Sequence, residues 1–185
     1  MGMKELTKPS VIGTLKVFDG LDLVVEKKNK IKLDNFVRTL AFGAVHTDVT
    51  NAQSYRISTI RFGSGGEDAD GNEKTPDVST DTLFQPMHSE DVVGSGNGIK
   101  VLDIIDDANN IIEPNSKIIE VNATISSTES NGVKFNELGL FDSSNKKLTH
   151  ITFDGITKTE NRTLSFTYQV EITVSWFWIV VIKKQ

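Results

Sequence analysis

Apolar and polar residues alternate strictly over a long stretch near the C-terminus. From residue 163 to residue 174, every second side chain is apolar. A helix with this sequence would spread its apolar side chains around the whole cylinder, whereas a strand would gather them on one face. Residues 119–126 show the same alternation. Both stretches are therefore predicted to be strands with one buried face.

Shorter β-prone runs, separated by turn residues, fill much of the remaining chain. Asp19-Gly20 separates residues 11–18 from residues 21–26, which predicts a two-stranded hairpin. Asn131-Gly132 and residues 143–146 are further turn signals. The other predicted strands are residues 54–62, 133–141 and 148–153, and an apolar run at residues 99–105 follows a polar insertion at residues 94–98.

One helix of about 10 residues is predicted to begin near Asp34. Asp34 can cap the free amide groups of the first turn, and Gly43 lies near the end. The apolar residues of this segment are spaced by three and four positions, so they are expected to pack one helix face against a sheet. They are Leu33, Phe36, Val37, Leu40 and Ala44.

These elements predict a mainly β protein, an antiparallel β-sandwich or jelly-roll-like fold with one short α-helix. A parallel α/β fold is disfavoured because helices do not alternate with the strands. The length suits a single domain, residues 1–185. Its parts are an N-terminal hairpin and helix (residues 11–45), a long polar loop expected to be exposed (residues 63–80), and a C-terminal strand region (residues 117–182).

Composition argues against several classes of function. The chain has no cysteine, so it forms no disulfide and no thiolate metal site. Its net charge of -5, with dispersed basic residues, argues against a nucleic-acid binder. The most apolar stretch, residues 176–182, is far shorter than the about 20 residues that a membrane-spanning helix needs. We therefore expect neither nucleic acid nor membrane among its partners.

The order of the segments resembles a family of bacteriophage tail proteins found in tail-fibre, baseplate and collar-associated components. In that pattern a hairpin leads to a helix, then to a strand that ends in a glycine-rich loop, and later to a Phe-x-Glu-x-Gly-Leu-Phe segment, the most distinctive match. The resemblance extends from about residue 21 to residue 175. The matching segments are residues 21–29, 35–44 and 57–66, Thr82-Leu83-Phe84, Phe135-Asn-Glu137-Leu-Gly139-Leu140-Phe141, residues 148–153, Lys158 and the closing strand.

This resemblance implies a non-enzymatic virion structural protein. It would be a tail, baseplate or collar component that assembles with other virion structural proteins as an adaptor or scaffold, and forms a homo-oligomer with ring or trimer symmetry. It would be assembled in the host cytoplasm and reside in the virion. Two alternatives stay open, a head decoration protein and a carbohydrate- or receptor-binding module of a phage fibre. For such a module, the aromatic stacking candidates are Tyr55, Trp176 and Trp178.

No motif for catalysis or cofactor binding stands out. His46, His88 and His150 are far apart and form no H-x-H or H-E-x-x-H arrangement. We expect surface or strand-edge positions for them rather than metal or catalytic roles. The sequence also contains no G-x-S-x-G nucleophile motif. We therefore expect no enzymatic activity and no cofactor.

Residues 67–73 bring four carboxylates and an amide together, and calcium prefers such oxygen ligands. The candidate ligands are Asp68, Asp70 and Asn72. The glycine falls in the wrong place for an EF-hand loop, and no glutamate follows at the twelfth position. A solvated acidic loop is the interpretation that we favour over a calcium site.

Glu137 lies in a predicted strand with apolar neighbours, and a buried carboxylate needs hydrogen-bond donors or a cation. We interpret Glu137 as a structural hydrogen-bonding group that bridges strand and loop. Gly139 and Phe141 of the same segment are also assigned structural roles. The alternative is that Glu137 points to solvent.

The closing strand changes character after residue 174. Residues 176–182 are apolar on both sides of the alternation, so both faces of such a strand must be covered. Either it is a central strand of its own domain, or it docks on a neighbouring subunit, where aromatic residues are enriched. We favour the subunit interface, with the contact residues Trp176, Phe177, Trp178, Ile179 and Val181.

Overall fold

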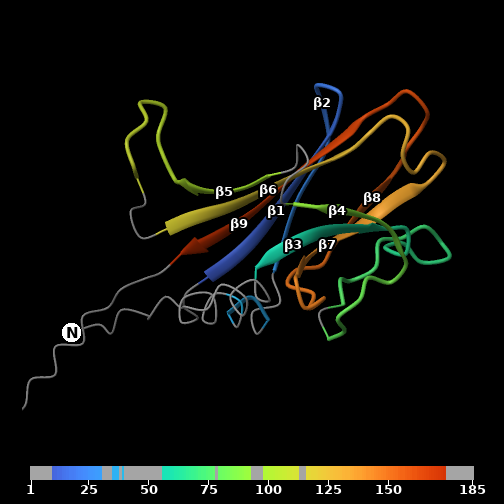
Figure 1. Cartoon of the computed structure of the whole chain (residues 1–185), viewed down its shortest axis with the longest axis horizontal. Coiled ribbons are helices and arrows are strands. Elements are labelled where there is room, and N and C mark those ends of the chain that lie inside the picture. The colour runs from blue at the N-terminus through green and yellow to red at the C-terminus, as the bar shows by residue number, and fades with distance from the viewer. Residues whose placement is uncertain are drawn as a thin grey trace, which may run out of the picture.

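The computed structural model describes residues 10–30, 35–37, 39, 56–77, 79–92, 98–112 and 116–173. In this part of the chain, nine strands form two antiparallel sheets (Figure 1). The strands are β1 (Ser10–Asp19), β2 (Asp22–Lys30), β3 (Ile57–Gly63), β4 (Pro86–Asp91), β5 (Gly98–Asp103), β6 (Ser116–Ile125), β7 (Lys134–Asp142), β8 (Ile151–Thr157) and β9 (Leu164–Thr173).

The two sheets face each other as a β-sandwich, which confirms the predicted fold class. The first sheet has the order β2-β1-β9-β6-β5, and the second has the order β4-β3-β7-β8. Apolar side chains from the inner faces of both sheets fill the space between them. Large members of this core are Leu15, Phe62, Phe135, Phe153, Phe166 and Tyr168.

The strictly alternating sequence forms β9, the middle strand of the first sheet. Phe166 lies opposite Val17 of β1 and Ala123 of β6, and all three side chains are buried. Each core-facing residue of β9 therefore meets neighbours on two strands. A slip of one residue would move the whole apolar set to the outer face, so the alternation fixes the register.

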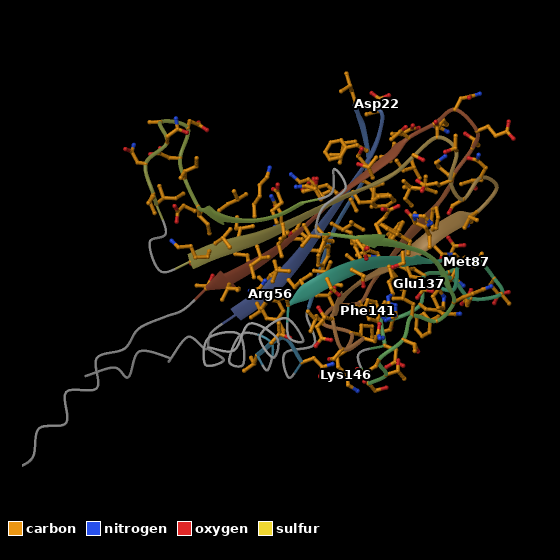
Figure 2. The ribbon with its side chains drawn as sticks, viewed as in Figure 1. Asp22, Arg56, Met87, Glu137, Phe141 and Lys146 are labelled. Carbon is orange, nitrogen blue, oxygen red and sulfur yellow. The ribbon has the colours of Figure 1, made fainter. Side chains whose placement is uncertain are left out.

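β7 is buried on both faces, although its sequence is not wholly apolar. Leu138 and Leu140 belong to the core between the sheets. Side chains alternate along a strand, so the residues between and beside these two face the outer side of the second sheet. They are Glu137, Gly139 and Phe141; Figure 2 labels the first and the last.

The helical residues in the described part are Asn35, Phe36, Val37 and Thr39. Phe36 is buried in the core, as its spacing predicts, whereas Val37 is 49% exposed. The prediction is wrong for Val37 because successive helix positions point about 100° apart, and here the core takes Phe36. The other residues of the predicted stripe lie outside the described part. No helix among the described residues is long and apolar enough to cross a membrane.

Two segments differ from the sequence prediction. The sequence does not predict β4, which is polar, begins with proline and pairs with β3 at a free edge of the second sheet. The strand predicted over residues 148–153 begins instead at Ile151. Leu148 and His150 precede it in a buried connection.

The loop predicted to be exposed, residues 63–80, is exposed only in part. Gly63, Gly65 and Gly66 are buried, whereas residues 68–73 are exposed. The prediction is wrong for the first residues because they lie against β7: a side chain at Gly63 would overlap the carboxylate of Glu137. Glycine permits this close approach of the backbone.

Candidate functional site

Glu137 is fully buried and joins β7 to the connection between β3 and β4. Its Oε1 atom accepts hydrogen bonds from the backbone amides of Gly65, at 3.1 Å, and Gln85, at 2.7 Å. Its Oε2 atom accepts one from the amide of Phe84, at 2.9 Å. One carboxylate therefore holds both ends of the connection. The alternative that Glu137 points to solvent is wrong.

The carboxyl group of Glu137 is ionised at neutral pH. Burial raises its pKa, but hydrogen bonds from His150 and from the amides of Gln85, Phe84 and Gly65 together lower it by more. The net effect places the pKa of Glu137 below its ordinary value of 4.5. The anion is thus stabilised by donors that the fold places around it.

Lys147 and His150 hold the middle of the same connection. Both are fully buried and lie between β7 and β8. Lys147 Nζ donates to the carbonyl oxygens of Asp77, at 2.6 Å, and Thr82, at 2.5 Å. In His150, Nδ1 lies 2.9 Å from the Asp77 carbonyl oxygen and Nε2 lies 3.0 Å from Glu137 Oε2. The surface position expected for His150 is therefore wrong, because both ring nitrogens meet buried polar partners.

Gly139 and Phe141 pack on the same outer side of β7. A β-carbon at Gly139 would lie 2.7 Å from the carbonyl oxygen of Thr149 and 3.2 Å from the side chain of Leu83. The ring of Phe141 is buried beneath the guanidinium group of Arg61, whose Cζ lies 4.2 Å from the ring centroid. Gly139 allows the covering segments to approach, and Phe141 fills space beneath a cation.

The calcium candidate Asp68 closes a tight turn with its own carboxylate. Its Oδ1 atom accepts hydrogen bonds from the amides of Asp70, at 2.9 Å, and Asn72, at 2.8 Å. The bond from the Asn72 amide is the main reason that the pKa of Asp68 is lowered. Gly71 has a φ of 81°, the left-handed conformation that this kind of hairpin turn requires.

Two further turns have the same construction. Asp106 and Asp142 begin them, and each Oδ1 accepts a hydrogen bond from the amide four residues later, at 2.8 Å and 2.9 Å. Their fourth residues, Asn109 and Asn145, have φ values of 63° and 62°, a conformation that asparagine tolerates. The aspartate of each turn is explained by its backbone contacts, so this geometry gives the calcium hypothesis no support.

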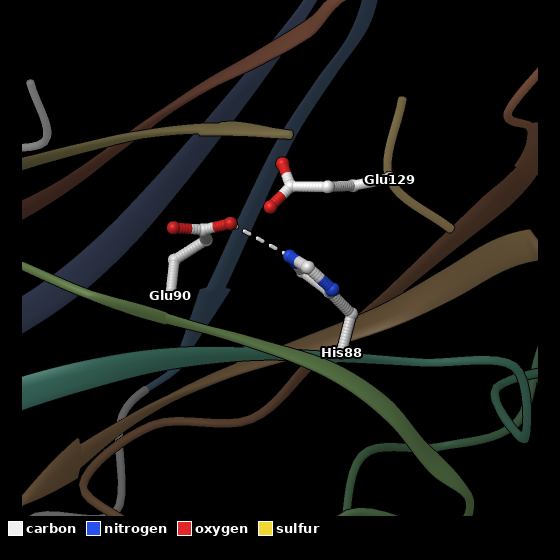
Figure 3. A group of neighbouring side chains, drawn as sticks. All are labelled: His88, Glu90 and Glu129. Carbon is white, nitrogen blue, oxygen red and sulfur yellow. Dashed lines mark hydrogen bonds and ion pairs between the residues drawn. The ribbon is translucent and has the colours of Figure 1, made fainter. Parts of the chain in front are cut away.

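Among the described residues, His88, Glu90 and Glu129 form a group in which one ligand atom of each lies within 4.8 Å of the others (Figure 3). His88 and Glu90 lie on β4, and Glu129 lies on the turn between β6 and β7. His88 Nε2 is 2.7 Å from Glu90 Oε1, and His88 Nδ1 is 2.9 Å from Ser130 Oγ. Figure 3 shows the Glu129 carboxylate facing the other two side chains.

The sequence predicts a surface or strand-edge position for His88 but gives no indication of this group. The signal is the spacing His88-x-Glu90, which puts two ligating side chains on one side of an extended segment. The polar sequence of β4 hides that signal, because no apolar alternation marks it as a strand. Nothing in the sequence indicates that Glu129 joins the pair, since it lies on a turn distant in the chain.

An apolar arm, residues 98–112, forms one edge of the first sheet and consists of β5 and the turn after it (Figure 1). Ile99 lies opposite Val121, and Val101 lies opposite Ile119, so both face the core side of the sheet. They are nevertheless exposed, Val101 by 69%. The arm also exposes Ile105, Ile111 and Ile112.

Several residues singled out in the sequence lie outside the described part of the chain. They are the interface candidates Trp176, Phe177, Trp178, Ile179 and Val181, the stacking candidate Tyr55, and His46.

The chain matches no protein-family model, no curated protein and no solved structure.

Proposed function

We propose that this chain is a non-enzymatic structural protein of a bacteriophage virion, a tail, baseplate or collar component that acts as an adaptor or scaffold. The observation that carries the proposal is the apolar arm, residues 98–112. Large contiguous apolar patches are uncommon on soluble monomers, and they mark surfaces that contact other proteins, membranes or ligands. The arm also ends the sheet, and an edge strand presents backbone groups that can pair with another chain.

The partner that fits this surface is a second copy of the chain. β5 ends at Asp103 opposite Lys117, and β9 ends at Thr173 opposite Ser116. The end of β5 and the last described residue, Thr173, therefore lie at the same end of the first sheet. The sequence that follows, residues 174–182, contains a single polar residue. Each copy thus carries a second apolar stretch in its sequence besides the arm, and two such stretches favour self-association.

The contacts of Glu137 support the virion assignment. The resemblance includes a glycine-rich loop and a Phe-x-Glu-x-Gly-Leu-Phe segment that are distant in sequence. Here the glutamate of that segment binds the amide of Gly65, within the glycine-rich loop. The two segments form one structural unit, which gives a physical reason for their occurrence together.

The burial of His150 and Glu137 argues against a catalytic role for this pair. A histidine hydrogen-bonded to a carboxylate has the composition of an acid–base pair. Both side chains are sealed from solvent and bind the covering connection, so a substrate cannot reach them.

Purified particles of the phage that encodes this chain test the proposal. Quantitative mass spectrometry is expected to find the chain at a fixed copy number in each particle, and gold-labelled antibodies are expected to decorate the tail, baseplate or collar. Absence of the chain from purified particles, while it is abundant in the infected lysate, would overturn the proposal.

A further inference from the structure

The inner side of β4 is polar, although it faces the core of the sandwich. His88 lies opposite the buried Phe62 of β3, and Glu90 follows two residues later on the same side of the strand. The exposed fraction of the side chain is 16% for His88 and 15% for Glu90. A histidine and a glutamate at such positions require polar partners or a cation.

The fold holds the ring of His88 in one orientation. Its centroid lies 6.1 Å from that of Phe62 and 6.4 Å from that of Phe135. Ser130 Oγ lies 2.9 Å from Nδ1, so a proton on Nδ1 can be donated to this hydroxyl oxygen. Nε2 then faces the carboxylates, and Glu90 Oε1, at 2.7 Å, can accept a proton from it. A metal ion bound to Nε2 would take the place of that proton. Metal-binding histidines are oriented in this way, with the second ring nitrogen hydrogen-bonded to a neighbour.

We propose that His88, Glu90 and Glu129 bind a divalent transition-metal ion, with zinc as the best match. One imidazole nitrogen and two carboxylate oxygens are common zinc ligands, and zinc takes a fourth ligand from water when the protein supplies three. Ligand atoms around tetrahedral zinc are roughly 3.3 Å apart. The ligand atoms here lie within 4.8 Å of one another, so small side-chain movements suffice.

The ion would fasten the edge of the second sheet. Two ligands belong to β4, and the third comes from the turn by which the chain crosses from β6 in the first sheet to β7 in the second. Calcium and magnesium prefer oxygen ligands alone, so neither should compete with zinc at this site. The inference is independent of the proposed virion role.

Inward-pointing charged residues are also known on edge strands, where they prevent pairing with other chains. That explanation accounts for His88 and Glu90 without a metal. It does not require Glu129 to face the pair from a different element. Oε2 of Glu129 accepts a hydrogen bond from the amide of Ser126 in its own turn, at 3.0 Å, and the carboxylate has a second oxygen that can bind the ion. The two explanations therefore differ in the effect of changing Glu129.

Isothermal titration calorimetry with zinc chloride on tag-free full-length protein tests the proposal. One zinc per chain is expected, and a hundredfold excess of zinc over Kd should raise Tm by roughly 5–10 °C. Glu129→Gln should weaken zinc binding at least about tenfold. Glu160→Gln, on an exposed turn and outside the ligand set, is the matched control and should bind zinc as the wild type does.

Ser130→Gly tests the role of the hydroxyl group without risk to the turn. Ser130 has a φ of 53°, which glycine adopts without strain, so the variant should fold normally. Its zinc affinity should fall by about 10–100-fold. No heat with wild-type protein would overturn the proposal and leave only the edge-protection explanation. Zinc binding that is unchanged in both Glu129→Gln and His88→Gln would overturn it as well, because the ion would then lie elsewhere.

Discussion

Nε2 of His150 lies 3.0 Å from Oε2 of Glu137, and neither side chain is exposed to solvent. Glu137 holds the two ends of the β3–β4 connection, and His150 contacts its middle at the carbonyl group of Asp77. Buried polar networks stabilise a fold only when their members are satisfied. The connection that covers the outer side of the second sheet therefore depends on a buried network in which Glu137 contacts both ends.

Glu137→Gln is expected to destabilise the protein by about 2–4 kcal/mol. The amide replaces one acceptor oxygen with a donor, and that donor meets backbone amides that also donate. Thermal and urea unfolding measure the effect. Glu160→Gln, an exposed position, is the control and should change stability by less than about 0.5 kcal/mol. An unchanged Tm for Glu137→Gln would contradict the role given to this carboxylate.

The same carboxylate predicts a pH dependence of stability. The folded-state pKa of Glu137 is below its ordinary value of 4.5, so its contribution is complete above that value and is lost as the pH falls through the folded-state pKa. The free-energy difference between wild type and Glu137→Gln should therefore be smaller at pH 3 than at pH 7. Urea unfolding across this range measures it. A difference that stays constant would show that the charge contributes nothing.

Gly139→Ala is expected to cost roughly 1–3 kcal/mol, because the added methyl group would lie 2.7 Å from the carbonyl oxygen of Thr149. Gly98→Ala is the matched control on another strand. A β-carbon there meets no atom within 4 Å, and Gly98 does not have a positive φ. Equal stabilities of the two variants in chemical denaturation would contradict the close approach of the covering segment.

Asp68→Ala and Asp106→Ala are expected to lower Tm by similar amounts, because each aspartate closes the same kind of turn. Calcium should leave the Tm of wild type and of both variants unchanged. Thermal shift assays with calcium or with a chelator measure this. A calcium-dependent rise in Tm that disappears only in Asp68→Ala would instead support a calcium site at Asp68, Asp70 and Asn72.

Much of the first sheet could be predicted from the sequence, because its strands are apolar on one face and polar on the other. The alternation in β9 and the Asp19-Gly20 turn between β1 and β2 are signals of this kind. Both depend on neighbouring residues alone. Gly20, with a φ of 62°, takes the conformation that such a turn needs.

The second sheet was harder to predict, because its polar residues are explained by contacts distant in sequence. His150 is buried because Asp77 and Glu137 lie on either side of it, and neither is adjacent to it in the chain. β4 has no apolar alternation because its inner side carries His88 and Glu90. The sequence of β5 predicts a strand but not the exposure of its apolar side chains. That exposure depends on how far the facing sheet extends.

Sedimentation velocity at micromolar concentration tests the central claim, that the arm at residues 98–112 binds a second copy of the chain. Wild type and Val24→Thr, a control at the opposite edge of the same sheet, should sediment as an oligomer. The double variant Val101→Thr, Ile111→Thr should sediment as a monomer, because threonine keeps the strand propensity and removes apolar contact area. A wild type that is monomeric at every concentration, or a double variant that is as oligomeric as the wild type, would contradict the claim.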